Sequence, residues 1–562
     1  MANAKNILFI MFDQLRWDYL SCYGHPHLQT PNIDRIASMG VRFTNARIQS
    51  PLCGPSRMST YTGRYVHSHG AAWNGYPLRV GEMTMGDHLR KLGMDAVLVG
   101  KTHMQADAEG MQRLGLEPDS IIGARQAECG FDAFERDDGL AFESNAGPNS
   151  PFVETHSAAK YNTYLKAKGY DGENPWHDYA NSGLDDDGNV LSGWFLKYSD
   201  QPANIAEEDS ETPYMTRRGI EFIEQAGDTP WLCHLSLIKP HWPYIVPAPY
   251  HDMYGPEHML APVRSDAEKQ TDHPVLAGLL QWMVSRTFAR DDVREKVLQA
   301  YMGLIKQIDD QMGVLFKFLE DTGRMEDTMI VLNSDHGDYM GDHWLGEKMF
   351  FHDTSVKVPL IIYDPSSKAD ATRGTTSDAL VEMIDLAPTF YEVAGGDASD
   401  VDHILEGQSL VPILHGTGNP DREVSFCEYD FGHTPQAEAM KLAPNDARMF
   451  MVATRDWKLI HFEGGFRPIL FDLANDPNEL VDLGKSPDHA EHIEAMYAHL
   501  HAWALRNSQR VTVPTKRILL RRKNMEIGKV GILIGVNGPE DLPPGAVDQY
   551  IGRKAVDKRA PT

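Results

Sequence analysis

Cysteine is scarce in this chain, which has five among 562 residues. The five are odd in number and widely scattered, at Cys22, Cys53, Cys129, Cys233 and Cys427. This distribution excludes the disulfide framework of small secreted proteins, in which paired cysteines are dense. We therefore expect a cytoplasmic protein, because that compartment is reducing and keeps cysteines as free thiols.

Long hydrophobic runs are also missing. No stretch reaches the roughly 20 apolar residues that a membrane-spanning helix needs. The N-terminal run at residues 7–12 is too short for the core of a signal peptide, and Asp13 follows it directly. We expect neither a signal peptide nor a membrane partner.

Positive charge is in short supply as well. Lys and Arg total 53 against 80 Asp and Glu, a formal net charge of -27. Such a surface repels nucleic acids and anionic membranes, so neither is an expected partner. The acidity can also serve solubility alone. An anionic substrate would have to be attracted locally, by cations gathered inside a pocket.

Apolar runs typical of buried parallel strands recur along the first 418 residues. They cover residues 6–12, 94–99 and 329–334. Helical patterns lie between them, at residues 84–92 and 294–322. This alternation predicts an α/β domain over residues 1–418, with a doubly wound, mostly parallel sheet flanked by helices. Each of these strands ends in charged or imidazole side chains, at the sheet edge where ligands bind in such folds.

Residues 104–230 and 419–508 depart from this pattern. The first segment is rich in Asp, Gly and Asn and has few periodic runs, so we expect irregular insertions that shape a pocket. The second predicts a smaller α+β domain. Its expected strands and helix cover residues 449–454, 458–462, 468–472 and 490–506.

Residues 509–562 form a basic extension on an acidic protein. The cations cluster at Lys516, Arg517, Arg521, Arg522 and Lys523. We hypothesise that this extension packs on a neighbouring subunit and gives a homo-oligomer, either a dimer or a tetramer. The alternative is a tail that folds on its own domain.

The stretch Cys53-Gly54-Pro55-Ser56-Arg57 carries the strongest chemical signal. No helix breaker follows until Gly63, and proline is tolerated in a first helical turn, so a helix is predicted to begin at Cys53. Free N–H groups and the helix dipole stabilise an anion there, and Arg57 returns to the same face one turn later. The alternative is a small buried hydrophobe, which most free cysteines are.

Two strand ends supply candidate metal ligands. Asp13 and Gln14 follow the first strand, and Asp335 and His336 follow the strand at residues 329–334. Two carboxylates, an amide oxygen and an imidazole suit Ca²⁺ or Mn²⁺ better than structural zinc, which prefers thiolates or more imidazoles. Singly, each residue is weak evidence, since an Asp after a strand is commonly a helix cap.

Further candidates follow other strands. Lys101 and His103 lie two apart on a segment that we expect to be extended, so they face the same side, one to neutralise an anionic ester and one to move a proton. His241 follows the apolar run at residues 231–238, and Lys348 follows the last strand end. Taken alone, a surface lysine and a structural histidine are the commoner explanations.

Cys53, Pro55 and Arg57, followed by Thr62-Gly63-Arg64, resemble the motif of type I sulfatases in the alkaline phosphatase superfamily. The resemblance implies an alkaline phosphatase-like fold whose small C-terminal domain carries an antiparallel sheet. It also implies oxidation of Cys53 to formylglycine (3-oxoalanine) by a formylglycine-generating enzyme. The hydrated aldehyde would be the nucleophile. It also implies one divalent cation. The implied ligands are Asp13, Gln14, Asp335, His336 and residue 53.

The resemblance implies a role for each remaining candidate. Arg57 would orient residue 53, while Lys101 and Lys348 stabilise charge on the sulfuryl oxygens. His241 would protonate the departing oxygen. His103 would then take a proton from the second hydroxyl of residue 53, which expels sulfate and restores the aldehyde.

Departures from the common motif leave the substrate open. Gln14 and His336 stand where many sulfatases have Asp and Asn, which resembles the branch of phosphonate monoester hydrolases and bacterial arylsulfatases. Asn74 matches a substrate-contacting asparagine of that branch, whereas Lys101 and His103 favour sulfate. We expect a sulfuric ester hydrolase acting on sulfate monoesters, with aryl sulfates the substrate class. The alternatives are a phosphonate monoester or phosphodiester hydrolase and a binding protein without turnover.

Overall fold

The structure, a computed structural model, describes residues 4–117, 120–127, 129–139, 159–419, 422–506, 511–524 and 535–542. The chain divides into two compact units. The larger comprises Met1–Gly396 and Leu405–Arg506, and the smaller comprises Asp397–Ile404 and Asn507–Thr562.

Strand β1 (Asn6–Asp13) runs through the middle of the main sheet, and all of its residues are buried. It pairs in parallel with β7 (Trp231–Pro240) on one side and β8 (Thr328–Ser334) on the other. Burying each large aliphatic or aromatic side chain contributes about 2 kcal/mol, so the apolar run predicted at residues 6–12 is a central element of the core. The strands predicted at residues 94–99 and 329–334 are confirmed within a residue.

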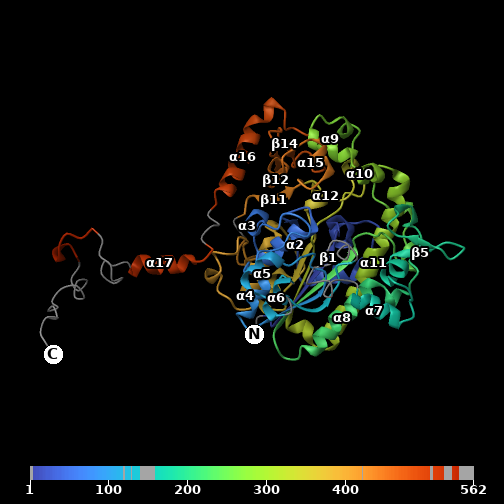
Figure 1. The fold of residues 1–562 in the computed structure, drawn as a ribbon, viewed down its shortest axis with the longest axis horizontal. Helices are drawn as coiled ribbons and strands as arrows, with labels where there is room; N and C mark the ends of the chain where they lie inside the picture. The colour runs from blue at the N-terminus through green and yellow to red at the C-terminus, as the bar shows by residue number, and fades with distance from the viewer. Residues whose placement is uncertain are drawn as a thin grey trace. The chain divides into compact units, whose positions relative to one another are not determined.

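The main sheet has eight strands in the order β10-β2-β9-β8-β1-β7-β3-β4. Its strand β1 is labelled in Figure 1. Pairing is parallel except at β9, which runs antiparallel to both of its neighbours. The predicted mostly parallel sheet is therefore confirmed. The other strands are β2 (Val41–Arg47), β3 (Asp95–Gly100), β4 (Asp132–Arg136), β9 (Leu360–Tyr363) and β10 (Thr375–Glu382).

Helices cover both faces of this sheet, as expected for a doubly wound fold. One face of β1, with Leu8 and Ile10, packs in one apolar cluster with α1 (Pro31–Met39), α8 (Glu211–Gln225) and α11 (Asp291–Asp321). On the other face the ring of Phe9 meets Phe390. The helices on that side are α2 (Cys53–Thr62), α4 (Met85–Arg90) and α13 (Leu386–Val393).

The expectation of irregular insertions over residues 104–230 is wrong for much of that segment. It contains β4 of the main sheet and α8, a helix of 15 residues that packs against β7. The buried positions Met215, Gly219 and Phe222 are spaced by four and three residues, so the helical period is present in the sequence. The other helices are α5 (Ala108–Leu114), α6 (Ile121–Ala127) and α7 (Ala159–Ala167). Residues 140–158 lie outside the described residues.

A second, antiparallel sheet follows, as predicted, with the strand order β11-β12-β13-β14. Helix α16 (Ala490–Ala504) covers it by packing Met496, Leu500 and Trp503 against Val452 and Leu459. This sheet belongs to the same compact unit as the main sheet, and a domain boundary near residue 419 stays a prediction. Its strands are β11 (Ser425–Asp430), β12 (Arg448–Ala453), β13 (Trp457–Phe462) and β14 (Ile469–Asp472).

The smaller unit contains helix α17 (Thr515–Asn524). The Lys516 ammonium pairs with the Asp400 carboxylate, and the Thr515 N–H donates to Asp402 Oδ1 at 3.2 Å. Much of the predicted basic extension, including residues 525–534 and 543–562, lies outside the described residues. Over the part of the chain that the structure describes, no helix combines the length and apolarity needed to cross a bilayer.

Helix α2 is buried throughout, and a neutral histidine supports it. The Ala71 N–H donates to His69 Nδ1 at 3.1 Å, which leaves the Nε2 proton for Ser59 Oγ at 2.9 Å. Burial, with a smaller effect of the Arg64 charge, lowers the pKa of His69 to about 3. A proton on Nδ1 would break the bond from Ala71.

We predict that His69 makes the protein less stable as the pH falls. The unfolded chain takes up this proton near pH 6.5 and the folded chain only near pH 3, so stability is complete above about 6.5 and is lost below it. The loss reaches about 2 kcal/mol at pH 5. His69→Asn keeps an acceptor for Ala71 but does not titrate.

The measurement is the free energy of unfolding in urea at pH 7 and pH 5. The difference between the two pH values should be smaller by about 2 kcal/mol in His69→Asn than in the wild type. His67→Asn, two residues away, is the control and should keep the wild-type difference. Equal pH differences in all three proteins would contradict the prediction.

Candidate active site

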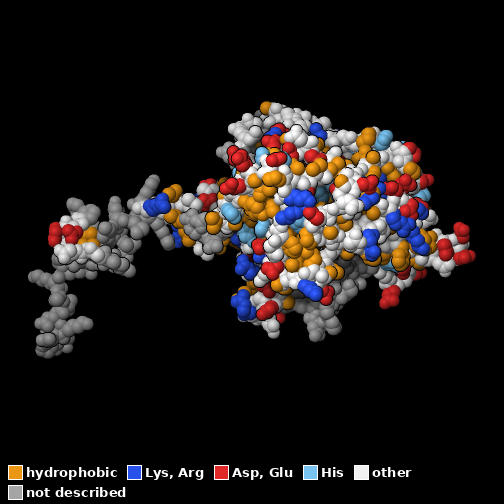
Figure 2. All heavy atoms as spheres, turned by 90° about the horizontal axis from the view of Figure 1, so that it is seen from above, with side chains coloured by type: hydrophobic (Ala, Val, Ile, Leu, Met, Phe, Trp, Pro, Cys, Tyr) orange, Lys and Arg blue, Asp and Glu red, His pale blue; other side chains and the backbone are white. Residues whose placement is uncertain are grey.

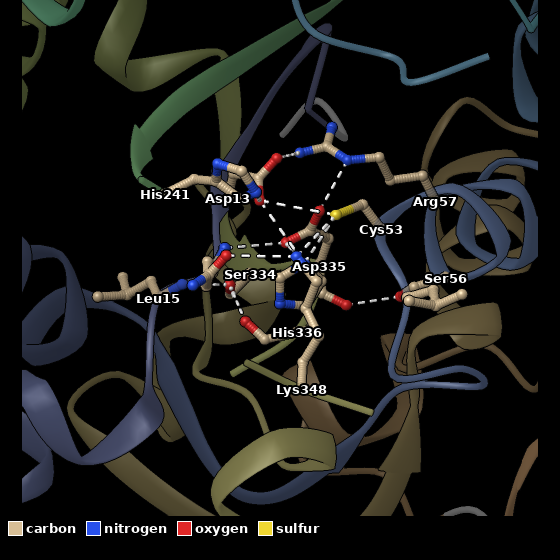
Figure 3. Close-up of polar contacts among 12 residues, drawn as sticks. Asp13, Leu15, Cys53, Ser56, Arg57, His241, Ser334, Asp335, His336 and Lys348 are labelled. Carbon is tan, nitrogen blue, oxygen red and sulfur yellow. Dashed lines mark hydrogen bonds and ion pairs between the residues drawn. The ribbon is translucent and has the colours of Figure 1, made fainter. Parts of the chain in front are cut away.

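Four side chains with metal-binding atoms meet at the carboxyl edge of the main sheet (Figure 3). Asp13 ends β1, Asp335 and His336 follow β8, and Cys53 is the first residue of α2. One ligand atom from each residue lies within 4.8 Å of the others, and all four residues are buried. The structure therefore brings together residues predicted from three separate segments.

The pairing of β1 with β8 accounts for this convergence. The two strands are adjacent and parallel, so their carboxyl ends meet at one edge. A hydroxyl joins these ends, because Ser334 Oγ accepts from the Leu15 N–H at 2.9 Å and donates to the Phe12 carbonyl at 2.9 Å. Gln14 has a left-handed φ of 66°, and its N–H donates to Asp335 Oδ1 at 3.0 Å.

Arg57 is fully buried and holds both carboxylates. Its Nε donates to Asp335 Oδ2 at 2.8 Å, and its Nη2 donates to Asp13 Oδ2 at 3.1 Å. Its Nη1 donates to Ser236 Oγ at 2.7 Å. Removing one partner of such a buried set costs about 3–5 kcal/mol, because a charge is left uncompensated. The arginine predicted to lie beside Cys53 thus fixes the strand ends as well.

The Cys53 thiol points into the cluster. Its Sγ lies 3.0 Å from His336 Nε2, 3.3 Å from Lys348 Nζ and 4.0 Å from Asp13 Oδ1. Burial alone would raise the pKa of the Cys53 thiol, but the positive charge of Lys348 leads the opposing effects, and the pKa is lower than usual. The site therefore favours an anionic group at position 53.

Two lysines place positive charge next to Cys53 and Asp13. Lys101 forms an ion pair with Asp13, and Lys348 Nζ donates to Gln14 Oε1 at 3.3 Å. Burial opposes both charges. The carboxylate of Asp13 and the sulfur of Cys53 nevertheless raise the pKa of Lys101 and of Lys348 above ordinary values. Both ammonium groups remain charged.

The expectation that Lys101 and His103 lie on an extended segment is wrong. His103 has a left-handed φ of 58°. The Asp138 carboxylate holds this turn, since its Oδ1 accepts from the backbone N–H of Thr102 at 3.0 Å and of His103 at 2.7 Å. Both predicted side chains still line one cavity. Burial, reinforced by the Lys101 charge, holds the pKa of His103 well below its usual value, so its ring is neutral.

His241 reaches the cluster from the end of β7. Its Nδ1 donates to the Trp242 carbonyl at 2.7 Å, and its Nε2 lies 4.0 Å from Asp13 Oδ1. Burial leads the effects that hold the pKa of His241 well below its usual value, against the attraction of Asp13. Asn74 lines the same cavity, but its Oδ1 accepts from the Gly54 N–H at 2.9 Å and so ties down the start of α2.

The donor set fits a hard or borderline divalent cation. His336 Nδ1 donates to the Gly337 carbonyl at 2.8 Å, which turns Nε2 toward the two carboxylates. A backbone bond of this kind typically orients a metal-binding histidine. Gln14 is oriented by two residues that the sequence analysis did not identify. Its Nε2 donates to the Asp338 carboxylate and to Tyr244 Oη, the latter at 2.6 Å.

Cys53, Lys101 and Lys348 line a cavity of about 730 Å³ whose walls are rich in tryptophan. The sequence analysis did not identify these aromatic residues. They are Trp73, Tyr76, Trp176, Trp194, Trp242 and Trp282. Outside the site, acidic and basic side chains are interspersed on the face drawn in Figure 2. The predicted cations gathered inside a pocket are thus found in Lys101 and Lys348.

Comparison with known proteins places the chain. The sulfatase family model matches residues 5–396, and a model of the C-terminal part of N-sulphoglucosamine sulphohydrolase matches residues 341–506. The multifunctional alkaline phosphatase superfamily protein PehA of Trinickia caryophylli is 29% identical, over 90% of this chain and 96% of its own. An arylsulfatase of Clostridium perfringens is 27% identical, over 87% of this chain and 92% of its own.

Among solved structures, the phosphonate monoester hydrolase of Silicibacter pomeroyi aligns with a TM-score of 0.77 and 25% identity. The alignment covers 90% of this chain and 96% of that one. The sulfatase model alone spans more than half of the sequence and includes every residue of the cluster. This chain belongs to the sulfatase family and is a hydrolase of anionic esters.

Proposed function

We propose that this protein hydrolyses sulfate monoesters and that aryl sulfates are its substrate class. The observation that carries the proposal is the position of Cys53. Its Sγ lies at the start of a buried helix, 3.3 Å from the Lys348 ammonium, and belongs to the cluster of Asp13, Cys53, Asp335 and His336, called the donor cluster below. Aromatic walls around this point suit the ring of a phenol leaving group.

Residue 53 would act as formylglycine, produced from Cys53 by a formylglycine-generating enzyme. The hydroxyls of the hydrated aldehyde would take the place of Sγ. One of them would attack sulfur in line with the departing phenol oxygen. Lys101 and Lys348 both line the cavity and would stabilise negative charge on the sulfuryl oxygens. Arg57 would act at one remove, by holding Asp13 and Asp335 in place.

The two histidines would handle protons. His241 Nδ1 donates to the Trp242 carbonyl, so Nε2 faces the cluster and carries no proton while the ring is neutral. To protonate the leaving oxygen, Nε2 would first take up a proton from solvent, and the nearby Asp13 carboxylate would support the imidazolium that forms. The neutral ring of His103 would take a proton from the second hydroxyl of residue 53. The carbon–oxygen bond to sulfate then breaks and the aldehyde is restored. A serine at this position has no second hydroxyl and would remain sulfated.

A single divalent cation, Ca²⁺ or Mn²⁺, is the proposed cofactor. Asp13, Asp335, His336 and residue 53 would hold it, together with the Gln14 amide oxygen. The carboxylates suit either ion, and the imidazole favours Mn²⁺. When bound, the cation supplies Lewis-acid charge next to the reacting group.

A phosphonate monoester or phosphodiester hydrolase is the second candidate. His336 belongs to the donor cluster and Gln14 is bonded to it through Asp335, and the similar structure from Silicibacter pomeroyi is a phosphonate monoester hydrolase. These substrates carry one negative charge, as sulfate monoesters do. The two lysines therefore serve either ester, and relative rates must decide.

We predict that the converted enzyme prefers 4-nitrophenyl sulfate to the 4-nitrophenyl ester of phenylphosphonate. The value of kcat/KM should be at least about tenfold higher for the sulfate, because Lys101 and His103, the pair that favours sulfate over phosphonate in the sequence, both line the active-site cavity. Conversion of residue 53 is checked by mass spectrometry of its peptide. Cys53→Ala should abolish both activities. A higher kcat/KM for the phosphonate would overturn the proposed substrate.

We predict that Arg57→Lys weakens metal binding by about 10- to 100-fold. Lysine keeps the charge, but it cannot donate to Asp13, Asp335 and Ser236 from three nitrogens. Calorimetric titration with Ca²⁺ and Mn²⁺ measures the affinity.

The matched control is Arg47→Lys, which changes another buried arginine, paired with Asp353 at 3.2 Å. It should bind metal as the wild type does. Asp335→Asn should remove binding, which ties the measured affinity to this cluster. Unchanged affinity in Arg57→Lys would show that the guanidinium does not position the ligands.

We also propose a cytoplasmic homo-oligomer. In the part of the chain that the structure describes, no cysteine forms a disulfide, which agrees with a reducing compartment. Helix α17 exposes 49% of Leu519 and 57% of Leu520 beside basic side chains, a surface that suits a neighbouring subunit. Removal of residues 509–562 should lower the number of subunits per particle, obtained by dividing the molar mass from light scattering by the mass of one chain. An unchanged number of subunits, or a full-length chain that is already a monomer, would contradict the proposed role of these residues in assembly.

A further inference from the structure

A second cavity, also of about 730 Å³, adjoins the active-site cavity. Helix α10 (Met283–Phe288) and the segment at residues 193–197 provide most of its walls. The lining is mainly apolar and includes Phe195, Met283 and Phe288. Phe195 and Met283 are 62% and 67% exposed. Apolar side chains exposed together at a hollow commonly mark a binding surface.

The two cavities share part of their walls. Trp194, Trp242, Val284 and Glu347 line both. The Trp242 ring stacks on His241 with centroids 4.8 Å apart, and Trp194 meets Trp242 edge to face at 4.9 Å. A continuous aromatic surface therefore leads from the histidine on the leaving-group side of the cluster into the second cavity.

Charge at the second cavity favours an uncharged occupant. Two of the three lining cations have acidic partners, since Lys296 pairs with Asp200 at 2.6 Å and Arg290 with Asp292 at 2.5 Å. The third, Lys197, lies over the Tyr198 ring, with Nζ 4.4 Å from the ring centroid. Glu347 stands where the two cavities meet and would repel an anionic group passing it. An apolar group, in contrast, gains from burial against these walls.

We propose that the second cavity is a subsite for the distal part of the leaving group. The favoured substrates are then elongated aryl esters, in which an uncharged apolar group extends past Trp242 toward Phe195 and Met283. This inference rests on the proposed function, because it places the reacting ester at residue 53. It assigns substrate selection to α10 and residues 193–197, none of which belongs to the donor cluster.

Thr287 offers a test of the subsite. It lines the second cavity but not the first, and its Oγ1 donates only within its own helix, to the Met283 carbonyl at 2.9 Å. Thr287→Trp fills the cavity without touching the donor cluster. Thr287→Val, of equal size, is the matched control. Thermal unfolding checks that each variant is folded.

The substrates are phenyl sulfate and biphenyl-4-yl sulfate, and hydrolysis is followed by release of the phenol. In the wild type we expect kcat/KM to be about tenfold or more higher for the biphenylyl ester, mainly through KM. Thr287→Trp should remove this advantage and leave phenyl sulfate within about twofold. Thr287→Val should behave as the wild type. Equal kcat/KM for both esters, or equal losses in Thr287→Trp, would overturn the subsite.

Binding of the free phenols separates this inference from the proposed reaction. Biphenyl-4-ol should bind the wild type about tenfold tighter than phenol, measured by quenching of tryptophan fluorescence, and Thr287→Trp should abolish the difference. This result would support the subsite even if neither sulfate were hydrolysed, an outcome that would instead refute the proposed function. Equal binding of the two phenols would overturn the subsite whatever the enzyme hydrolyses.

Discussion

The bridge from one buried guanidinium to two carboxylates holds the rest of the site together. Arg57 contacts Asp13 and Asp335, which end two different strands, and it rises from the helix that Cys53 begins. In a dry interior these carboxylates repel each other, and each would cost several kcal/mol without a partner. The register of β1 with β8 and the position of α2 must therefore bring both carboxylates within hydrogen-bonding distance of the one Arg57 guanidinium. The same arrangement brings the residues of the donor cluster together.

The sheet was predictable because a strand that is buried on both faces has a continuous run of apolar residues in the sequence. The runs at residues 6–12, 94–99 and 329–334 are apolar at almost every position, and each is a strand within a residue or so. Residues 104–230 were harder because their composition resembles that of loops. Helix α8 is nevertheless amphipathic, and the helical spacing of its apolar residues could have been recognised in the sequence. The turn at His103 could not, because the Asp138 carboxylate that imposes it lies 35 residues away.

The donor cluster was predictable for a different reason. Asp13, Cys53, Asp335 and His336 each sit directly at the end of a strand or the start of a helix, where a short motif fixes the local backbone. The side-chain amide of Gln14 points its oxygen toward Lys348, because its nitrogen donates to Asp338 and Tyr244. Asp338 lies two residues after His336 and could have been suspected. Tyr244 and the tryptophan walls come from irregular segments, and no spacing announces which side of a loop faces a pocket.

Different residues surround the reacting ester group and the rest of the substrate. In the proposed reaction, residue 53, the lysines and the donor cluster would contact only the reacting group, and sulfate monoesters and phosphonate monoesters both present a tetrahedral group of one negative charge. Nothing in the cluster measures the size of the leaving group. The walls beyond His241 can do so, because an aromatic surface gains free energy with each apolar group that it covers. In the proposed subsite, selectivity among esters would be set by α10 and residues 193–197, which lie outside the donor cluster.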